Sequence, residues 1–598
     1  MKKIISTLAL IILTAFLIHK EHSLPRPKEI IPEGCIHCHN KVSDPDPSHP
    51  ISAFGCHLCH LGNPYSLLKE RAHFHSVKNP GDLRVVDRTC GRIDCHFQIA
   101  SRVKRSIMAT NRGMLKTIQK QWLNVERSSV DVEMLLSDNP PDNLAIEHYR
   151  KMCGGCHLWK KRGDFPGEKG LRGGGCTDCH IIDDHENKSK NNFEAFSHTR
   201  ITTRIPSENC VKCHNRSARI GLSYFGRFES EGYGTPYDGM DLTSRRLSGN
   251  RFYIQLPADV HFSKAGMDCV DCHTGTGLMG DGRIYDQMED QTDITCEACH
   301  TPEFYRGTGN DSLAARLAFL NRKVPDVRGK ELGITKKGTP LYNLQRDGEK
   351  IFLFRKRDGY PIEMGPSPAI KSHHGMRGHD RLSCQSCHSS WMPQCYGCHL
   401  TVNKGKNQRD WLTGQEWPGL WEERRSYSRF SRPALGLKND STVSPFSPCQ
   451  VFVSYYEKEG QYRPDLSFKI FTMSSFDPHT TQKGSRSCQE CHGDPKILGL
   501  GEGSFSRRRE GWQFRATYDP QSSGLGASFA MDAFVNIQGE ALQGTPRRAA
   551  RPFDKEELER ILWVNACVGC HGKYEDKIYL NFELSKKRFN EDDLPCKR

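Results

Sequence analysis

The chain has 598 residues, and its 85 Lys and Arg against 71 Asp and Glu give a formal charge of +14 at pH 7. Its hydrophobic fraction is 36% and its mean hydropathy is −0.65, which is lean for a protein of this length built on an ordinary apolar core. A positive charge of this size would suit a nucleic-acid or acidic partner, but 26 Cys and 27 His point to another explanation.

The first 22 residues predict an export signal. Lys2 and Lys3 precede a largely apolar run of 15 residues from Ile4 to Ile18, which is short of the about 20 residues that a membrane-spanning helix needs. We interpret residues 1–22 as a signal peptide, and because no small-x-small cleavage site follows, an uncleaved N-terminal anchor is the alternative. No cysteine precedes Cys35, so a lipoprotein anchor is not expected at the usual position, and no later segment is apolar enough to span a membrane.

A pentad of the form Cys-x-x-Cys-His recurs eleven times, whereas chance predicts roughly 0.05 copies at this Cys and His content. This pattern is the attachment signature for c-type haem: the two thiols form thioether bonds with the haem, and the histidine becomes an axial ligand of the iron. A zinc site would need four ligands and would not require a histidine directly after the second cysteine. The eleven motifs are Cys35-Cys38-His39, Cys56-Cys59-His60, Cys153-Cys156-His157, Cys176-Cys179-His180, Cys210-Cys213-His214, Cys269-Cys272-His273, Cys296-Cys299-His300, Cys384-Cys387-His388, Cys395-Cys398-His399, Cys488-Cys491-His492 and Cys567-Cys570-His571.

A twelfth site is predicted at Cys90, Cys95 and His96, where four residues separate the thiols instead of two. The longer loop can bulge and still present both sulfurs to one porphyrin edge, and the tetrahaem cytochromes of sulfate reducers show such a spacing. Twelve sites use 24 of the 26 cysteines. Cys449 and Cys596 remain, and we interpret them as a disulfide or as two idle thiols.

The motifs set the predicted organisation of the chain. The first eight lie within 266 residues, about 33 for each haem, which is too short for each site to bury a core of its own. We therefore expect the haems themselves to form the core. Helices are predicted over 116–126 and 554–571 from their periodicity, and hairpins over 341–362 and 449–473. The parts in order are a leader at 1–22, an eight-haem region at 23–300, a haem-free connector with a β-hairpin at 301–383, a haem pair at 384–400, a haem-free β-rich segment at 401–487 and a two-haem C-terminal region at 488–598.

With these motifs, residues 35–571 resemble a multihaem c-type cytochrome with twelve haems, a class familiar from bacteria that respire metals or other extracellular acceptors. The resemblance implies a mostly irregular and α-helical chain wrapped around a row of haems; the sequence adds a small β-rich element at about 335–480. It also implies an exported protein, in the periplasm or associated with the outer membrane or extracellular. Other cytochromes or redox proteins would be its partners, and an outer-membrane porin-like channel is a further candidate.

Bound haems would offset most of the formal charge of +14. A ferric haem with two propionates carries about −1, so twelve bring about −12 and leave roughly +2. We therefore interpret the Lys and Arg residues largely as counter-charges for propionates, and no nucleic-acid partner is expected. Membrane contact is expected only through an N-terminal anchor.

Eleven further histidines are candidates for the second axial ligand, because electron-transfer haems are normally six-coordinate. A scattered histidine is ordinarily a surface or core residue, but several of these precede a motif by five to twelve residues. Most haems are therefore predicted to be ligated by two histidines, which favours a lower potential than methionine ligation. The candidates are His49, His73, His75, His148, His185, His198, His261, His373, His374, His379 and His479.

Two functions fit these sites. The first is an electron conduit, favoured by the near-equal numbers of haems and free histidines, with no catalytic residue expected. The alternative is a reductase for nitrogen or sulfur oxyanions, with one five-coordinate haem. The lysine that replaces the proximal histidine in nitrite-reducing multihaem enzymes is absent from all twelve motifs. Short spacings predict neighbouring haems at His39 and His60, His157 and His180, His273 and His300, and His388 and His399.

Overall fold

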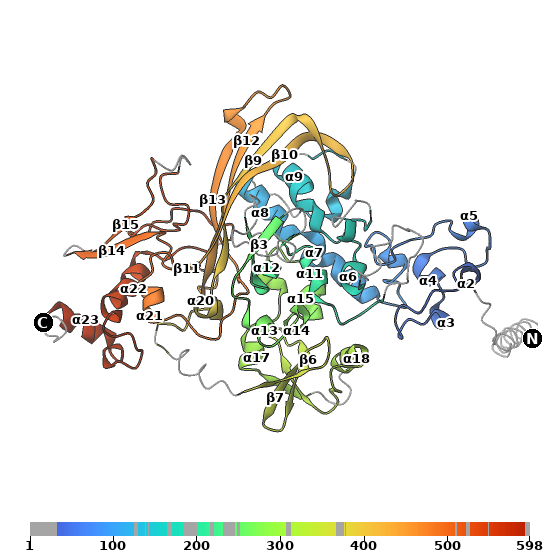
Figure 1. Ribbon diagram of the computed structural model, residues 1–598, viewed down its shortest axis with the longest axis horizontal. Coiled ribbons are helices and arrows are strands. Elements are labelled where there is room, and N and C mark those ends of the chain that lie inside the picture. Colours follow the sequence, from blue (N-terminus) through green and yellow to red (C-terminus); the bar gives the residue numbers. More distant parts are fainter. Residues whose placement is uncertain are drawn as a thin grey trace, which may run out of the picture. The chain divides into compact units, whose positions relative to one another are not determined.

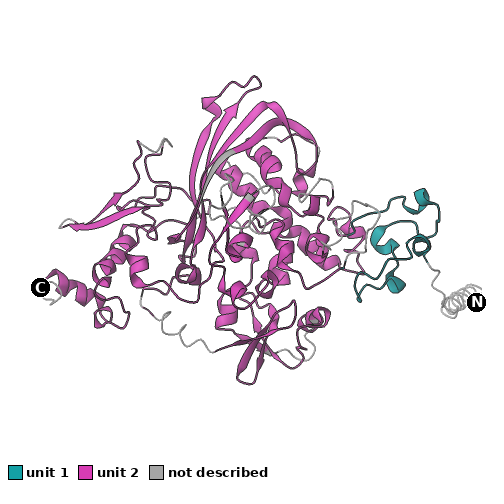
Figure 2. Ribbon diagram, viewed as in Figure 1, with its two compact units in different colours: residues 1–80, 186–200 teal, residues 81–185, 201–598 magenta. Residues whose placement is uncertain are grey.

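The structure is a computed structural model, and it forms two compact units that are described separately (Figure 2). The first unit comprises residues 1–80 and 186–200, and the second comprises residues 81–185 and 201–598. The residues described are 33–124, 130–137, 139–141, 143–163, 170–182, 200–215, 220–230, 246–247, 251–306, 312–365, 376, 378–508, 511–521, 527–547 and 549–591.

The first unit is built from short helices joined by turns. None of the four helices described in this unit contains a buried residue. The helices are α2 (Gly34–Cys38), α3 (Ile51–Phe54), α4 (His57–His60) and α5 (Lys69–Ala72).

A helical region opens the second unit, where four helices pack around buried side chains that include Leu83, Leu115 and Tyr149. The predicted helix over 116–126 is confirmed as part of α8, which ends at Leu123 before a left-handed Asn124. These helices are α6 (Phe97–Arg105), α7 (Ile107–Thr110), α8 (Arg112–Leu123) and α9 (Leu144–His148), and they are accompanied by the short turns η1 (Val86–Arg88), η2 (Glu133–Leu136), η3 (Tyr149–Cys153) and η4 (Gly154–Cys156).

Long strands dominate the second half of this unit, seen side by side in Figure 1. They form a five-stranded sheet in the order β10-β9-β12-β11, with β13 also paired to β12. Strands β9 and β12 run parallel, and the other pairs are antiparallel. The β12–β13 pair confirms the hairpin predicted over 449–473. The strands are β9 (Met392–Arg409), β10 (Glu416–Ser431), β11 (Ala434–Leu437), β12 (Val443–Tyr456) and β13 (Phe468–Ser475).

The other described strands form three further sheets. The hairpin predicted over 341–362 is confirmed as β6 and β7, which turn at Gly348 with a φ of 61°. The sheet of the connector contains β4 (Phe304–Arg306), β5 (Glu331–Ile334), β6 (Pro340–Asp347), β7 (Lys350–Phe354) and β8 (Pro361–Met364). A second sheet contains β1 (Arg227–Ser230), β3 (Arg251–Gln255) and β2 (Arg246–Leu247). The third pairs β14 (Gly503–Arg508) with β15 (Gly511–Ala516).

The predicted helix over 554–571 is confirmed as α22 (Lys555–Val568), which begins with a capping box between Asp554 and Glu557. Many of the remaining helices are single turns. They are α10 (Cys176–His180), α11 (Ser207–Val211), α12 (Ile220–Tyr224), α13 (Val260–Ser263), α14 (Cys269–Cys272), α15 (Gly275–Met279), α16 (Met288–Gln291), α17 (Glu297–His300), α18 (Ser312–Asn321), α20 (Cys384–His388), α21 (Cys488–His492) and α23 (Phe582–Asn590), with the turns η7 (Pro464–Leu466) and η8 (Lys577–Tyr579).

The expected fold class is wrong. The chain is not mostly irregular and α-helical with one small β element; it is a mixed α/β protein with 31% helix, 23% strand and a large β region through its middle. Strands occur outside 335–480, and within that segment β9 is 18 residues long. The expectation failed because pairing with distant strands, which no local pattern specifies, extends the segment around 395–399 into the long strand β9.

No helix among the described residues is long and apolar enough to cross a bilayer. The predicted leader at 1–22 lies outside the described residues.

Candidate functional site

Nine of the twelve motifs form one helical turn. Three are helices from the first cysteine to the histidine, namely α10, α20 and α21. In six others the histidine N–H donates to the carbonyl of the first cysteine, four residues earlier. These bonds, of 2.8 to 3.1 Å, are made by His39, His60, His214, His273, His300 and His571. A single turn brings residues four apart onto one face, so each motif can present its first thiol and its histidine together.

The motif with the longer spacing closes in the same way. The His96 N–H donates to the Cys90 carbonyl at 3.0 Å, although His96 stands six positions after Cys90, instead of four positions as in the shorter motifs. The inserted residues form a loop in which the Cys95 N–H bonds the Arg92 carbonyl at 3.0 Å and Arg92 pairs with Asp94. The insertion is therefore absorbed locally, and the ends of the motif keep the contact that defines the shorter ones.

Two motifs depart from the helical turn. At 153–157 a π-helical turn is followed by η4, and His157 has an extended backbone with φ −124° and ψ 156°. Burial lowers the pKa of His157 to about 3, and neither ring nitrogen makes a well-formed hydrogen bond to a described residue. Its neutral imidazole is suited to binding a metal ion.

The motif at 395–399 lies inside strand β9. Cys398 packs on one face of the sheet with Val451, whereas the His399 ring stacks on Phe452 at 4.7 Å. Successive strand residues point to opposite faces. The thiol of Cys398 and the ring of His399 therefore lie on opposite sides, unlike in the helical motifs.

Cys449, one of the two cysteines outside the motifs, lies on the neighbouring strand. Its Cα is the register partner of Cys395 in the parallel pair of β12 and β9. Cys449 is exposed on strand β12, and the Thr472 hydroxyl donates to its backbone carbonyl at 2.5 Å. Cys596, the other such cysteine, lies outside the described residues.

Four candidate distal histidines face the proximal histidines of four motifs. Two imidazoles bound through nitrogen to one first-row metal ion, at about 2.0 Å each, have ring centres about 6.2 Å apart. The ring centres of the four pairs are separated by nearly this distance: 6.1 Å for His39 and His73, 6.0 Å for His300 and His261, 6.2 Å for His273 and His479, and 6.1 Å for His492 and His379. The separation lies within the about 4.5–7 Å of ordinary ring pairs and equals that of two imidazoles on opposite sides of one metal ion, so each pair has room for a metal centre.

The other ring nitrogen of many predicted ligands is held by the protein. A hydrogen bond from Nδ1–H fixes the tautomer and leaves the Nε2 lone pair for a metal. The acceptor is the Asp259 carboxylate for His261, at 2.8 Å. Backbone carbonyls serve the others, at 2.8 to 3.2 Å: Val77 for His60, Lys69 for His73, Thr202 for His180, Gly484 for His388, Asp477 for His479 and Ile561 for His492.

The remaining distal candidates are less defined. His75 has a φ of 63° and its ring is tilted by 54° against that of Phe74, with centres 4.1 Å apart, and the ring centre of His49 is 5.9 Å from that of Phe54. His148 is buried between Trp122 and Trp421, at 4.7 Å from each, and burial lowers its pKa to about 3. His185, His198, His373 and His374 lie outside the described residues.

Thiols from different motifs lie side by side. In the first unit, the sulfurs of Cys35 and Cys56 and a carboxylate oxygen of Glu33 lie within 4.8 Å of one another. In the second unit, contact with Cys156 and burial raise the pKa of Cys213. Burial, followed by the nearby thiol of Cys387, raises the pKa of Cys491 to about 12. The other neighbouring pairs in the second unit are Cys210 with Cys269, Cys272 with Cys299, and Cys296 with Cys384.

These contacts arrange eight motifs of the second unit in a row. Asn209 ties the motif at 176–180 to the next one by donating to the Cys179 carbonyl at 2.8 Å. At the far end, Tyr579 lies near both Cys488 and Cys567, and burial together with these thiols raises its pKa to about 12. The motifs at 153–157 and 176–180 both adjoin the motif at 210–214. From there the row continues in sequence order through 269–273, 296–300, 384–388, 488–492 and 567–571. The motif at 384–388 thus has neighbours far away in sequence.

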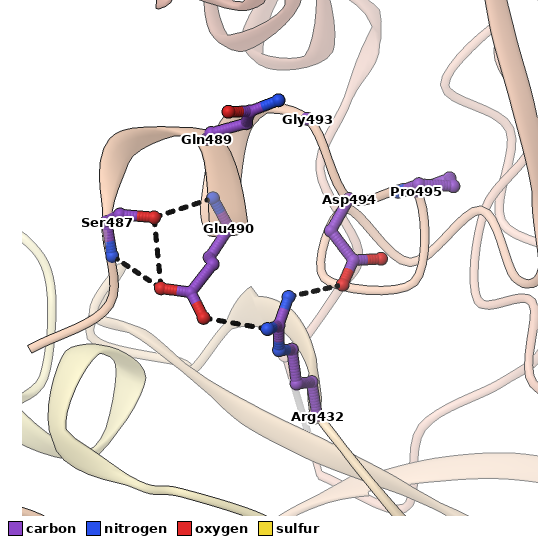
Figure 3. A pocket seen from close by; sticks show the side chains of 7 residues that line it. All are labelled: Arg432, Ser487, Gln489, Glu490, Gly493, Asp494 and Pro495. Atoms are coloured by element: carbon purple, nitrogen blue, oxygen red, sulfur yellow. Dashed lines mark hydrogen bonds and ion pairs between the residues drawn. The ribbon is translucent and has the colours of Figure 1, made fainter. Parts of the chain in front are cut away.

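A shallow pocket of about 350 Å³ lies beside α21 (Figure 3). Arg432 bridges Glu490 at 2.7 Å and Asp494 at 3.3 Å, and Glu490 also caps the helix through Ser487. The charged groups of this pocket pair with one another (Figure 3). Arg432, which directly follows strand β10, therefore anchors α21 to the end of that strand, and the charged groups that line the pocket are already paired.

Sequence reasoning missed the cations placed at the junctions between motifs. The Arg172 guanidinium donates to the Cys156 sulfur at 3.5 Å, Lys356 lies beside Cys272 and Cys299, and Arg486 lies beside Cys387 and Cys491. Each of these cationic residues lies in a loop or hairpin outside the motifs whose thiols it lies beside. No local signal separates such residues from the many other Lys and Arg of the chain.

Comparison with known proteins gives no relative: no family model, no curated protein and no solved structure matches this chain.

Proposed function

We propose that this protein carries electrons along about twelve covalently bound c-type haems, most of them ligated by two histidines. The observation that carries the proposal is the set of four proximal–distal histidine pairs with ring centres 6.0 to 6.2 Å apart. Each proximal member directly follows the second cysteine of a motif. Cysteine chemistry and imidazole spacing therefore point independently to the same cofactor.

The residues of this chain would hold the haems in three ways. The two thiols of each motif would attach the porphyrin, and the motif histidine with its facing histidine would ligate the iron. The Nδ1–H bonds to carbonyl oxygens and to Asp259 would fix the orientation of the imidazoles. Iron porphyrin supplies reversible one-electron chemistry when bound, and two protein ligands on an iron leave it no free position for a substrate.

The arrangement of the sites supports transport in preference to a single catalytic centre. Neighbouring thiols link the motifs at 153–157, 210–214, 269–273, 296–300, 384–388 and 488–492, Asn209 joins the motif at 176–180 to this row, and Tyr579 extends it to 567–571. Sites so close in space, within one chain, allow successive transfer along the row. The motif at 395–399 stands apart because it lies in β9.

The location and partners follow from the same proposal. Thioether attachment of haem belongs to the exported side of the bacterial membrane in the resembling family, which agrees with the leader-like residues 1–22. We therefore place the protein in the periplasm, or at or beyond the outer membrane. Its partners would be other cytochromes or redox proteins, or an outer-membrane porin-like channel.

Mass spectrometry of the purified exported protein, combined with spectroscopy of its oxidised form, tests the proposal. We expect about twelve covalently bound haems and uniformly low-spin ferric iron. A colourless protein, or one holding zinc, would overturn the assignment of the cofactor. A substantial high-spin signal that responds to added small ligands would favour the reductase instead.

A further inference from the structure

One lysine is buried between two neighbouring motifs of the row. Lys356 is 5% exposed and follows strand β7 in the connector. Its ammonium donates to the Val270 carbonyl at 2.5 Å, and its backbone N–H donates to the Asp271 carboxylate at 2.6 Å. Both acceptors are the inner residues of the motif at 269–273. The motif thus holds Lys356 at both its backbone and its side-chain end.

The same ammonium also faces the next motif. It lies close enough to Cys272 and Cys299 for the charges to interact, and its pKa is lowered by burial. The Tyr342 ring covers it at 5.0 Å. Among the described residues it makes no ion pair, although the carboxylates of Asp271 and Asp293 lie near enough to act on it. A positive charge held away from water acts more strongly on its surroundings than a surface charge does.

We propose that Lys356 raises the reduction potentials of the two haems predicted at Cys269–His273 and Cys296–His300. The inference rests on the proposed function. It adds a residue whose charge sets the reduction potentials of two neighbouring sites in the row. Reduction adds one negative charge to each site, and a nearby buried cation stabilises the reduced form over the oxidised form. Because one ammonium lies between the two motifs, it shifts both sites together, and salt does little to screen it.

The alternative is that Lys356 only fastens the β7–β8 hairpin to the motif at 269–273. A purely structural role depends on hydrogen bonds and packing, and it would change stability without changing two potentials selectively. Charge is the property that separates the two explanations. Lys356→Met keeps the length of the side chain and removes its charge, whereas Lys356→Arg keeps the charge.

The experiment is an equilibrium redox titration of the full-length, haem-loaded protein, followed by haem absorbance. In Lys356→Met we expect two of the twelve haem equivalents to move to more negative potentials, with at least a tenfold loss in the reduction equilibrium constant, or about 59 mV for one electron. Lys356→Arg should titrate like the parent. The matched control is Lys350→Met, because Lys350 begins strand β7, which Lys356 follows, is 61% exposed and pairs with Glu363; it should leave the curve unchanged.

A second variant keeps the inference testable if Lys356→Met folds poorly. Asp271→Asn removes a negative charge beside the same two motifs, so two equivalents should move to more positive potentials. Haem content is measured first for each variant. If the parent lacks haem, the proposed function itself fails. If haem content is normal but the curves of Lys356→Met and the parent coincide, or Lys356→Arg shifts as far as Lys356→Met, the inference alone is overturned.

Discussion

The pairing of His273 with His479 gives a direct test of the proposed ligation. The two rings are nearly parallel, at 11°, with centres 6.2 Å apart, and the Asp477 carbonyl holds Nδ1 of His479 at 2.9 Å. His479→Ala removes one ring from one site and leaves every cysteine and proximal histidine in place. One site of the predicted twelve would then lose its second ligand, so about one twelfth of the iron should become high-spin.

Electron paramagnetic resonance and visible absorption of the oxidised protein measure this fraction. Added imidazole should restore the low-spin spectrum, because the space left by the side chain admits the free base. His37→Ala is the matched control: His37 is exposed on α2 and occupies a variable position of a motif, so its loss should create no high-spin iron. An entirely low-spin spectrum for His479→Ala, at unchanged haem content, would refute the reasoning from ring separation.

Three further outcomes are expected. Cys90→Ser combined with Cys95→Ser should lower the covalent haem count by one in mass spectrometry; an unchanged count would remove the twelfth site. Glu557→Gln should destabilise the protein by about 1–2 kcal/mol at pH 7 in denaturant unfolding, because the neutral amide loses the charge-assisted bonds from Arg551 and Arg381. Burial alone would raise the pKa of Glu557, but the Arg551 side chain, the Asp554 N–H and Arg381 lower it to about 2. This stabilisation is therefore present above the unfolded pKa near 4.5 and lost as pH falls through 2, so the gap between Glu557→Gln and the parent should close there; a constant gap would contradict it.

Features encoded by neighbouring residues were predictable. The Asp-Gly turn at 347–348 specifies the β6–β7 hairpin because glycine accepts the φ of 61° found there. The capping box and apolar spacing specify α22. The twelve motifs are equally local, since each pattern places its own two thiols and histidine within five to seven residues.

Contacts between distant segments were not predictable in the same way. The motif at 395–399 reads like the other ten Cys-x-x-Cys-His segments, yet pairing with β10 and β12 extends it into a strand. The choice of partner for each proximal histidine is also non-local, since His479 follows His273 by 206 residues. Spacing along the chain gave candidates for the second ligand but could not assign them.

The sequence by itself determined the chemistry of this protein: which thiols and imidazoles stand together, and therefore which cofactor they suit. Only the tertiary structure decided which motifs are neighbours, which histidines face each other, and that the ammonium of Lys356 is buried between Cys272 and Cys299. The physical reason is that a five-residue turn fixes its own geometry through local backbone bonds. The order of the row depends instead on strand pairing and side-chain packing across hundreds of residues.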